Sequence, residues 1–291
     1  MTEYGLLLKG IGSFYEVLTD AGDTVTCKAR GAFRREGLVP TVGDRVGIER
    51  QQSGYEQLCE ILPRRNLSVR PAVANIDQLL IVVSASSPAP DWMLVDRLII
   101  AANRMQVKPI PVLNKIDTAS DAVRETFLHE YHAFDTLTVS AETRDGLDAL
   151  KAILPGKVTC FAGQSAVGKS SLLNALFPDL HLETGGLSQK TERGRHTTRH
   201  AELWPYNGGA VLDTPGFSLF ETECLEQDEL DACYPEFAHA FPCRFPGCMH
   251  ISEPDCGVKP LLASGELTEQ RYERYKEIAK DYQLRRKHRY D

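Results

Sequence analysis

Residues 157–176 read KVTCFAGQSAVGKSSLLNAL, and this stretch decides the fold. An apolar run at 158–162, typical of a buried strand, leads into G-x-x-x-x-G-K-S at Gly163 to Ser170, and a helix-like stretch with its leucines on one side follows. A loop of this pattern between a strand and a helix surrounds a polyphosphate with backbone N–H groups. Its lysine, Lys169, reaches the outer phosphates, and the hydroxyl of Ser170 takes a Mg²⁺ position. The pattern therefore predicts a nucleotide-binding loop, and the alternative is a structural glycine turn.

The neighbouring sequence alternates apolar strands with amphipathic helices. Asp91 is placed to cap a helix whose apolar residues recur at helical spacing over 94–102. We expect further strands at 79–83, 109–113 and 136–139, and helices near 122–131 and 147–154. This βαβ rhythm is typical of an α/β domain with a mostly parallel sheet and helices on both faces.

A base-reading motif follows the predicted strand 109–113, where Asn114-Lys115-Ile116-Asp117 begins the next loop. A carboxylate there can accept the N1–H and N2–H₂ groups of guanine, whereas adenine offers no such pair of donors. Asp117 therefore predicts selection of guanine, while Asn114 would brace the loop and the stem of Lys115 would lie along the base. Taken alone, the motif also fits an ordinary turn at a strand end. After the next strand, backbone N–H groups of residues 140–143 are expected near the guanine O6 atom.

Two further segments complete the predicted nucleotide site. An apolar strand precedes D-x-x-G at Asp213 to Gly216, where the carboxylate holds Mg²⁺ through water and the glycine N–H meets the γ-phosphate. Residues 185–200 are expected to form a switch loop, in which Thr197 or, preferably, Thr198 completes the Mg²⁺ shell. The predicted Mg²⁺ ligands are Ser170, Thr198 and Asp213. The residues predicted to contact the nucleotide are Asn114, Lys115, Asp117, Ser140, Ala141, Gly163, Gln164, Ser165, Ala166, Val167, Gly168, Lys169, Ser170, Ser171, Asp213 and Gly216.

The order of these segments along the chain is unusual. The base-reading segments at 114–117 and 140–143 precede the phosphate loop and D-x-x-G, which reverses the usual order in GTPases. A closed set of sheet contacts tolerates such a change when the chain ends are relocated to another loop. We therefore expect a circularly permuted domain, in which the segment after Gly216 leads directly into the next domain.

Cysteine and histidine gather within fourteen residues near the end of the chain, at Cys243, Cys248, His250 and Cys256. Three thiolates and one imidazole make the complement of a closed, structural Zn²⁺ site. The alternative is a set of reduced cysteines buried as small apolar residues. Competing ligands nearby are Cys224, Cys233 and His239. The cysteines that lie in strand patterns and are expected in the core are Cys27, Cys59 and Cys160.

The first part of the chain shows short alternating strands separated by turn residues. The expected strands are 6–10, 14–19, 24–29, 45–49 and 57–62. Five short strands in about 65 residues suit a small closed barrel such as an OB-fold, a common oligonucleotide binder. Strand counting alone does not exclude an SH3-like barrel.

Charge is unevenly distributed along the chain. The net charge is −7, but residues 71–242 carry −10, whereas 1–70 carry +1 and 258–291 carry +3. Each basic flank holds a cluster suited to phosphate backbones, although a solvated face explains either cluster equally well. The candidate RNA-binding residues are Lys28, Arg30, Arg34, Arg35, Arg285, Arg286, Lys287 and Arg289.

Length and composition limit the classes to which the protein can belong. A chain of 291 residues predicts two or three domains. With 42% hydrophobic and 25% charged residues, collagen, low-complexity disorder and a small disulfide scaffold are excluded. We see neither an apolar run of membrane-spanning length nor a targeting leader, and expect a cytoplasmic protein with no membrane partner.

The segments NKID, GQSAVGKSS and DTPGF and the Cys3His run, in this order behind a small barrel, resemble the circularly permuted, small-subunit-dependent GTPases of the RsgA (YjeQ/YloQ) family. The resemblance implies an OB-fold at 1–70, a permuted GTPase domain at 71–222, and a zinc-binding domain with a helical tail at 223–291. It implies GTP hydrolysis to GDP, with Mg²⁺ and one structural Zn²⁺, stimulated by the small (30S) ribosomal subunit during its late maturation. Contact with 16S rRNA and a monomeric state are part of this expectation. Ala166 departs from the glycine usual in the family, and its methyl group adds some strain at a tight turn.

Hydrolysis requires an oriented water, and Phe217 stands where familiar GTPases have glutamine after D-x-x-G. His196 in the switch loop is the nearest polar candidate for a catalytic residue, and the resemblance points to it too; the alternative is a bystander histidine. Two other functions fit the sequence. One is a guanine-nucleotide-gated RNA-binding module with negligible catalysis, which small subunits would not stimulate. The other is a small-molecule kinase or ATPase, in which Asp117 would not affect nucleotide choice.

Overall fold

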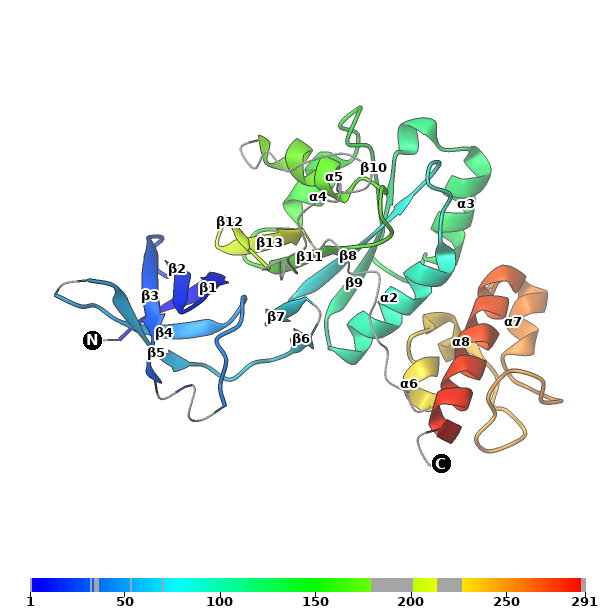
Figure 1. Ribbon diagram of the computed structural model, residues 1–291. Coiled ribbons are helices and arrows are strands. Elements are labelled where there is room, and N and C mark those ends of the chain that lie inside the picture. The colour runs from blue at the N-terminus through cyan, green and yellow to red at the C-terminus, as the bar shows by residue number, and fades with distance from the viewer. Residues whose placement is uncertain are drawn as a thin grey trace, which may run out of the picture.

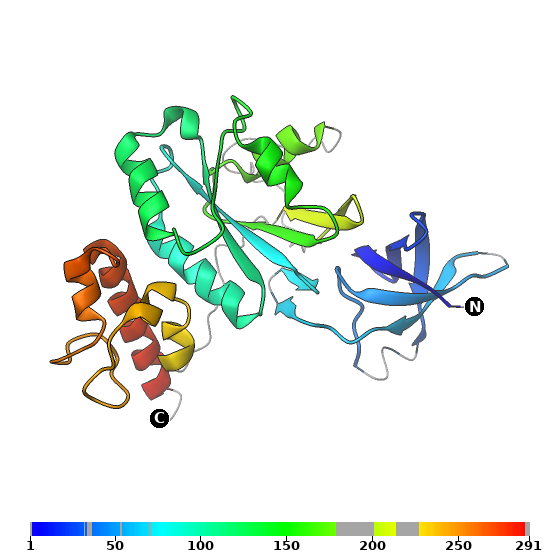
Figure 2. The same cartoon turned by 180° about the vertical axis from the view of Figure 1, so that it is seen from behind.

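The computed structural model describes residues 2–31, 33, 37–52, 54–69, 71–178, 201–213 and 227–288, with the backbone alone for residues 213, 227–228 and 286–288. Three parts follow one another across the molecule in both views (Figures 1 and 2). A β-barrel lies at one end, a larger sheet with helices lies in the middle, and a group of helices and loops lies at the other end.

The barrel is closed, and its five strands follow the order β1-β2-β3-β5-β4. This order, with a parallel pair between β3 and β5, is that of the OB-fold, which the sequence left open against an SH3-like barrel. Its interior is filled by fully buried side chains such as Leu7, Val17 and Leu58. The strands are β1 (Glu3–Ile11), β2 (Phe14–Thr19), β3 (Thr24–Ala29), β4 (Arg45–Glu49) and β5 (Glu56–Ile61).

A small two-stranded sheet of β6 (Leu67–Val69) and β7 (Ala72–Ala74) connects the barrel to the middle of the molecule. Its strands are three residues long, too short to show an alternating pattern, and the sequence did not predict them. The N–H of Ala74 donates to the carbonyl of Val42 in the barrel. At Gly43, where φ is +89°, a Cβ atom would lie 2.1 Å from the Ala74 carbonyl oxygen, so only glycine permits this contact.

The central sheet has six strands in the order β10-β9-β8-β11-β13-β12, and all pairs except β12–β13 are parallel. Alternate residues of β8 enter two different cores, because Leu79 and Ile81 pack with α2 whereas Leu80 and Val82 pack with α4 and α5. Helices therefore cover both faces, as predicted. The strands are β8 (Gln78–Ser84), β9 (Lys108–Asn114), β10 (Leu137–Val139), β11 (Val158–Ala162), β12 (Trp204–Tyr206) and β13 (Gly209–Asp213), and the helices are α2 (Trp92–Arg104), α3 (Asp121–Glu130), α4 (Leu147–Ala152) and α5 (Lys169–Leu176).

The C-terminal part packs against α2. Ile100 of α2 belongs to the same hydrophobic cluster as Tyr275 and Ile278. The helices of this part are α6 (Gln227–Asp231), α7 (Lys259–Ser264) and α8 (Glu269–His288), with a 3₁₀ turn at Pro235–His239. In the described residues, no helix combines the length and apolar character needed to cross a membrane.

The barrel also contacts the strand hairpin at the far edge of the sheet. Lys9 of β1 forms an isolated antiparallel bridge with Glu202, and the Lys9 ammonium lies 2.8 Å from the Glu202 carboxylate. The N–H of Leu203 donates to the carbonyl of Leu8 over 2.9 Å. These contacts attach the barrel to the residues that lead into β12.

Candidate nucleotide-binding site and metal centre

The phosphate loop connects β11 to α5, as the sequence predicted. Gly163 and Gly168 have φ values of +135° and +99°, which side chains other than glycine rarely adopt. The Lys169 ammonium donates to the carbonyl oxygens of Gly163 and Gln164, both at 2.8 Å. The lysine thus lies across the start of the phosphate loop.

Ala166 carries the strain expected at this position. Its φ of +64° lies in the left-handed region, which is about 1–2 kcal/mol unfavourable for a residue with a Cβ atom. The Lys115 ammonium donates to the Ala166 carbonyl over 2.9 Å, and the side-chain amide of Asn114 donates to the Val167 carbonyl over 2.8 Å. Two residues of the predicted base motif therefore hold the strained loop in place.

The base motif itself is organised around Asp117 and Ser140. Their strands β9 and β10 are parallel neighbours, so the loops after them meet at one edge of the sheet. The Ser140 hydroxyl donates to the Asp117 carboxylate over 2.6 Å and accepts the N–H groups of Glu142 and Thr143. The expectation that N–H groups throughout 140–143 are available is therefore too broad. Among the described residues, the N–H of Ala141 has no hydrogen-bond partner, and it is the donor left for a ligand.

Gly168 provides a direct test of the contact between the two loops. A Cβ atom at Gly168 would lie 2.4 Å from the amide nitrogen of Asn114, so Gly168→Ala should displace Asn114 from the loop as well as strain the backbone. We expect GTP affinity, measured by fluorescence titration, to fall about 10- to 100-fold. Gly156→Ala is the matched control, because Gly156 has a φ of +69° but nothing within 4 Å. Equal losses in the two variants would contradict the contact.

Several predicted nucleotide-site residues cannot be placed in full. The backbone of Asp213 lies beside Phe161 at the end of β11, next to the phosphate loop, as its predicted role requires. Its side chain, together with Thr197, Thr198, His196 and Gly216, lies outside the described residues.

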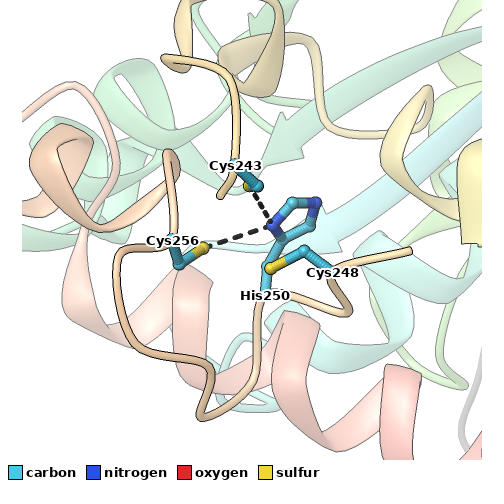
Figure 3. Close-up of side chains that lie close together, drawn as sticks. All are labelled: Cys243, Cys248, His250 and Cys256. Atoms are coloured by element: carbon cyan, nitrogen blue, oxygen red, sulfur yellow. Dashed lines mark hydrogen bonds between the residues drawn. The ribbon is translucent and has the colours of Figure 1, made fainter. Parts of the chain in front are cut away.

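The four predicted metal ligands come together in the C-terminal part. The Nδ1 atom of His250 lies 3.3 Å from Sγ of Cys256 and 3.5 Å from Sγ of Cys243, and Cys248 completes the group (Figure 3). All four ligand atoms lie within 4.8 Å of one another. Zn²⁺ bonds of about 2.0–2.3 Å in a tetrahedron set ligand atoms about 3.5–3.8 Å apart, so this donor set fits zinc.

Residues around the cluster orient it. The Nε2 atom of His250 lies 3.1 Å from the Asp231 carboxylate, whose other oxygen accepts from the Tyr275 hydroxyl over 2.8 Å. The N–H of Gly257 donates to Sγ of Cys243 over 3.2 Å. A carboxylate on the far ring nitrogen fixes the orientation of a metal-binding imidazole. Sequence reasoning missed Asp231 and Tyr275, because neither belongs to a spacing pattern with the ligands.

The competing candidates lie elsewhere. Cys233 donates its thiol to the Glu229 carbonyl, and His239 pairs with Glu266. Cys224 lies outside the described residues. Burial raises the pKa of the Cys27 thiol to about 11 and that of Cys160 still further above its ordinary value. Both are core thiols, as predicted, whereas Cys59 is half-buried.

The role of Asp231 leads to a prediction. Asp231→Asn should weaken zinc binding about 10-fold or more, because the amide holds His250 in place without its charge. Competition with a chromogenic chelator measures this affinity on the full chain. Glu266→Gln is the control, since Glu266 contacts His239 outside the cluster. If both variants keep wild-type zinc affinity, Asp231 has no part in the site.

The predicted RNA-binding residues are partly engaged in ion pairs. Arg30 pairs with Glu49, and Arg285 pairs with Asp281. Lys28 lies on the outer surface of the barrel, where its ammonium faces two aromatic rings. Outside the described side chains are Arg34, Arg35, Arg286, Lys287 and Arg289.

The phosphate loop after β11, the base motif bound to it, and the position of that motif earlier in the chain define a circularly permuted P-loop GTPase. Sequence profiles agree with this class: the profile of the RsgA GTPase matches residues 61–223, and that of the RsgA N-terminal domain matches residues 4–55. The chain belongs to the RsgA GTPase family.

Relatives and solved structures span nearly the full length of the chain. A protein of Geobacillus kaustophilus named small ribosomal subunit biogenesis GTPase RsgA is 43% identical over 93% of this chain and 94% of its own. A protein of the same name from Ruminiclostridium cellulolyticum is 43% identical, over 96% and 93%. YjeQ from Thermotoga maritima superposes with a TM-score of 0.83 at 33% identity, covering 97% of this chain and 99% of that one. YloQ, described as a circularly permuted GTPase, has a TM-score of 0.81 at 33% identity, covering 98% and 96%.

Proposed function

We propose that this protein binds GTP between the phosphate loop and the base motif, hydrolyses it to GDP and phosphate, and acts in late maturation of the small ribosomal subunit, which stimulates its turnover. The double link from Asn114 to Val167 and from Lys115 to Ala166 carries the nucleotide part of the proposal. It holds a base-reading loop and a phosphate-binding loop at one separation, as one nucleotide requires. The names of relatives 43% identical support the ribosomal part.

Magnesium and water complete the proposed reaction. Ser170, Thr198 and Asp213 are the proposed Mg²⁺ ligands, and the ion would offset charge on the phosphates. Asp117 reads guanine, and the Ala141 N–H, which has no hydrogen-bond partner among the described residues, meets the base from the next loop. His196 is the proposed catalytic residue, which orients the attacking water when the small subunit is bound.

This assignment of His196 has a defined expectation. His196→Ala should lower subunit-stimulated turnover about 100-fold, because a general acid–base or water-orienting group typically supplies at least that factor. GTP affinity should stay unchanged, and phosphate release with small subunits together with nucleotide titration separates the two effects. Full stimulated turnover in the variant would remove His196 from the mechanism.

The remaining parts of the proposal concern zinc and the partner. One structural Zn²⁺ would be held by Cys243, Cys248, His250 and Cys256, whose donor set fits it. The barrel, the permuted domain and the C-terminal part (1–70, 71–222 and 223–291) would act together as a monomer in the cytoplasm. Contacts to 16S rRNA would come from the basic clusters of the barrel and the tail.

Sedimentation with purified subunits tests the partner. With a non-hydrolysable GTP analogue, we expect the protein to sediment with the 30S subunit and not with the 50S subunit, and GDP should release it. Raised salt should weaken the complex, because phosphate contacts depend on counterion release. Equal binding to both subunits, or to neither, would overturn the ribosomal part of the proposal.

A further inference from the structure

An exposed aromatic pair lies on the outer surface of the barrel. Phe14, at the start of β2, and Tyr55, just before β5, remain 38% and 50% exposed. Their ring centroids are 4.9 Å apart, and the rings meet edge to face at 66°. Ile11, at the end of β1 and paired with Phe14 in the strand register, is 54% exposed beside them. Large apolar side chains gathered at one surface position mark an interaction site more often than isolated ones do.

A lysine lies over both rings. Lys28 of β3 is the register partner of Phe14, and its ammonium nitrogen lies 5.0 Å from the Phe14 centroid and 4.8 Å from the Tyr55 centroid. Neighbouring cations are engaged differently, since Arg30 pairs with Glu49 and Arg50 with Glu3. Among the described residues, no carboxylate oxygen lies within ion-pair distance of Lys28. Its charge is therefore available to an anion from outside.

Exposed aromatic rings and an available ammonium match the chemistry of a nucleotide. Aromatic side chains stack on unpaired bases of any sequence, and a lysine beside them contacts the phosphate. A protein partner fits less well, because lysine is depleted from the centre of protein–protein interfaces. Lys28, by contrast, is central to this cluster.

We propose that Phe14, Tyr55 and Lys28 form a stacking site for an unpaired base of RNA. The proposal rests on the proposed function, because the small subunit supplies the RNA. It adds the two aromatic residues, which a search for basic clusters does not find, and it gives Lys28 a phosphate to contact.

Binding of variants to 30S subunits with a non-hydrolysable GTP analogue, over a series of salt concentrations, tests the site. Phe14→Leu combined with Tyr55→Leu keeps apolar side chains and removes the stacking rings, and should weaken binding about 10-fold or more. The salt dependence should stay as in the wild type. Lys28→Gln should weaken binding and lower the slope against salt by about one. The control is Tyr4→Leu, because Tyr4 is an exposed barrel tyrosine (37%) that bonds Glu60 instead; it should bind as the wild type does.

A second measurement does not depend on variants. Ultraviolet irradiation of the wild-type complex should attach a nucleotide to the peptide that contains Tyr55. Urea unfolding of every variant should match that of the wild type, which shows that each one folds.

The outcomes separate this proposal from the function on which it rests. If the wild type binds 30S subunits and the double leucine variant binds equally well, the stacking site is wrong and the function stands. The stacking site is also wrong, and the function stands, if the double variant loses binding but no nucleotide attaches near Tyr55. The rings would then contact a protein. If the wild type fails to bind 30S subunits, the proposed function and the stacking site both fall.

Discussion

Replacing Asp96 by alanine should lower the free energy of unfolding by about 3–5 kcal/mol, because it removes one of the two carboxylates that pair with each of two buried arginines. Asp96 lies in α2 and is 2% exposed. It accepts from Arg271 over 2.7 Å and from Arg274 over 2.6 Å, and both arginines belong to α8. The Tyr131 hydroxyl donates to the same carboxylate over 2.9 Å.

Other carboxylates complete this buried network. Arg271 also bonds Glu236, and Arg274 also bonds Glu130 at the end of α3. Burial alone would lower the pKa of Arg271, but Asp96 and Glu236 hold it above its ordinary value. The arginine therefore stays charged, and removal of Asp96 leaves part of its desolvation penalty uncompensated.

Urea unfolding at constant zinc and GDP concentration measures the change in the free energy of unfolding. The control is Asp281→Ala in the same helix, because Asp281 pairs with Arg285 and Arg97 in partly exposed ion pairs and should contribute about 1 kcal/mol or less. Similar losses in the two variants would show that the network contributes no more than a surface pair. The expected difference has a structural meaning, since the network joins the zinc-binding part to α2 and α3, and α3 begins just after the base motif.

Replacing Asp117 by asparagine should weaken GTP binding on the order of 1000-fold, because two hydrogen bonds from guanine to a charged acceptor are lost. An asparagine side chain has one acceptor and turns an N–H₂ group toward the donors of the base. The Ser140 hydroxyl, which donates to Asp117 over 2.6 Å, also loses its charged partner.

Titration with GTP and with ATP gives the ratio of the two affinities, which tests the role of Asp117. Weak ATP binding should be unaffected, so the preference for GTP should disappear in Asp117→Asn. Asp121→Asn is the control, because Asp121 is an exposed carboxylate in the first turn of the following helix. An unchanged ratio of GTP to ATP affinity would favour the small-molecule kinase or ATPase instead.

Much of the fold could be predicted from local patterns. Most strands of the barrel and of the central sheet carry alternating or continuous apolar residues, and their predicted ranges agree with the structure within three residues. The exception is the short strand β12, which the sequence did not predict. The phosphate loop and the Cys3His cluster have fixed spacings, so sequence alone identified them. The helix cap at Asp91 was predicted in the same way and is present, since Asp91 accepts from the Leu94 N–H.

Contacts between distant segments could not be predicted. Asp96 and Arg271 are 175 residues apart in sequence, and Lys9 and Glu202 are 193 apart, so no local period connects them. Asp231 similarly meets His250 only because α6 folds against the metal loops. Charged residues at such positions look like ordinary surface residues in sequence, and tertiary packing alone reveals their partners.

Phosphate release from GTP, with and without purified 30S or 50S subunits and with ATP as the control, tests the central claim most directly. Strong stimulation by 30S subunits alone, with GTP alone, is the result predicted for a small-subunit-dependent GTPase. Binding to the 30S subunit without stimulation would leave a guanine-nucleotide-gated RNA-binding module. Absence of stimulation by either subunit, or equal release from ATP, would contradict the proposed function.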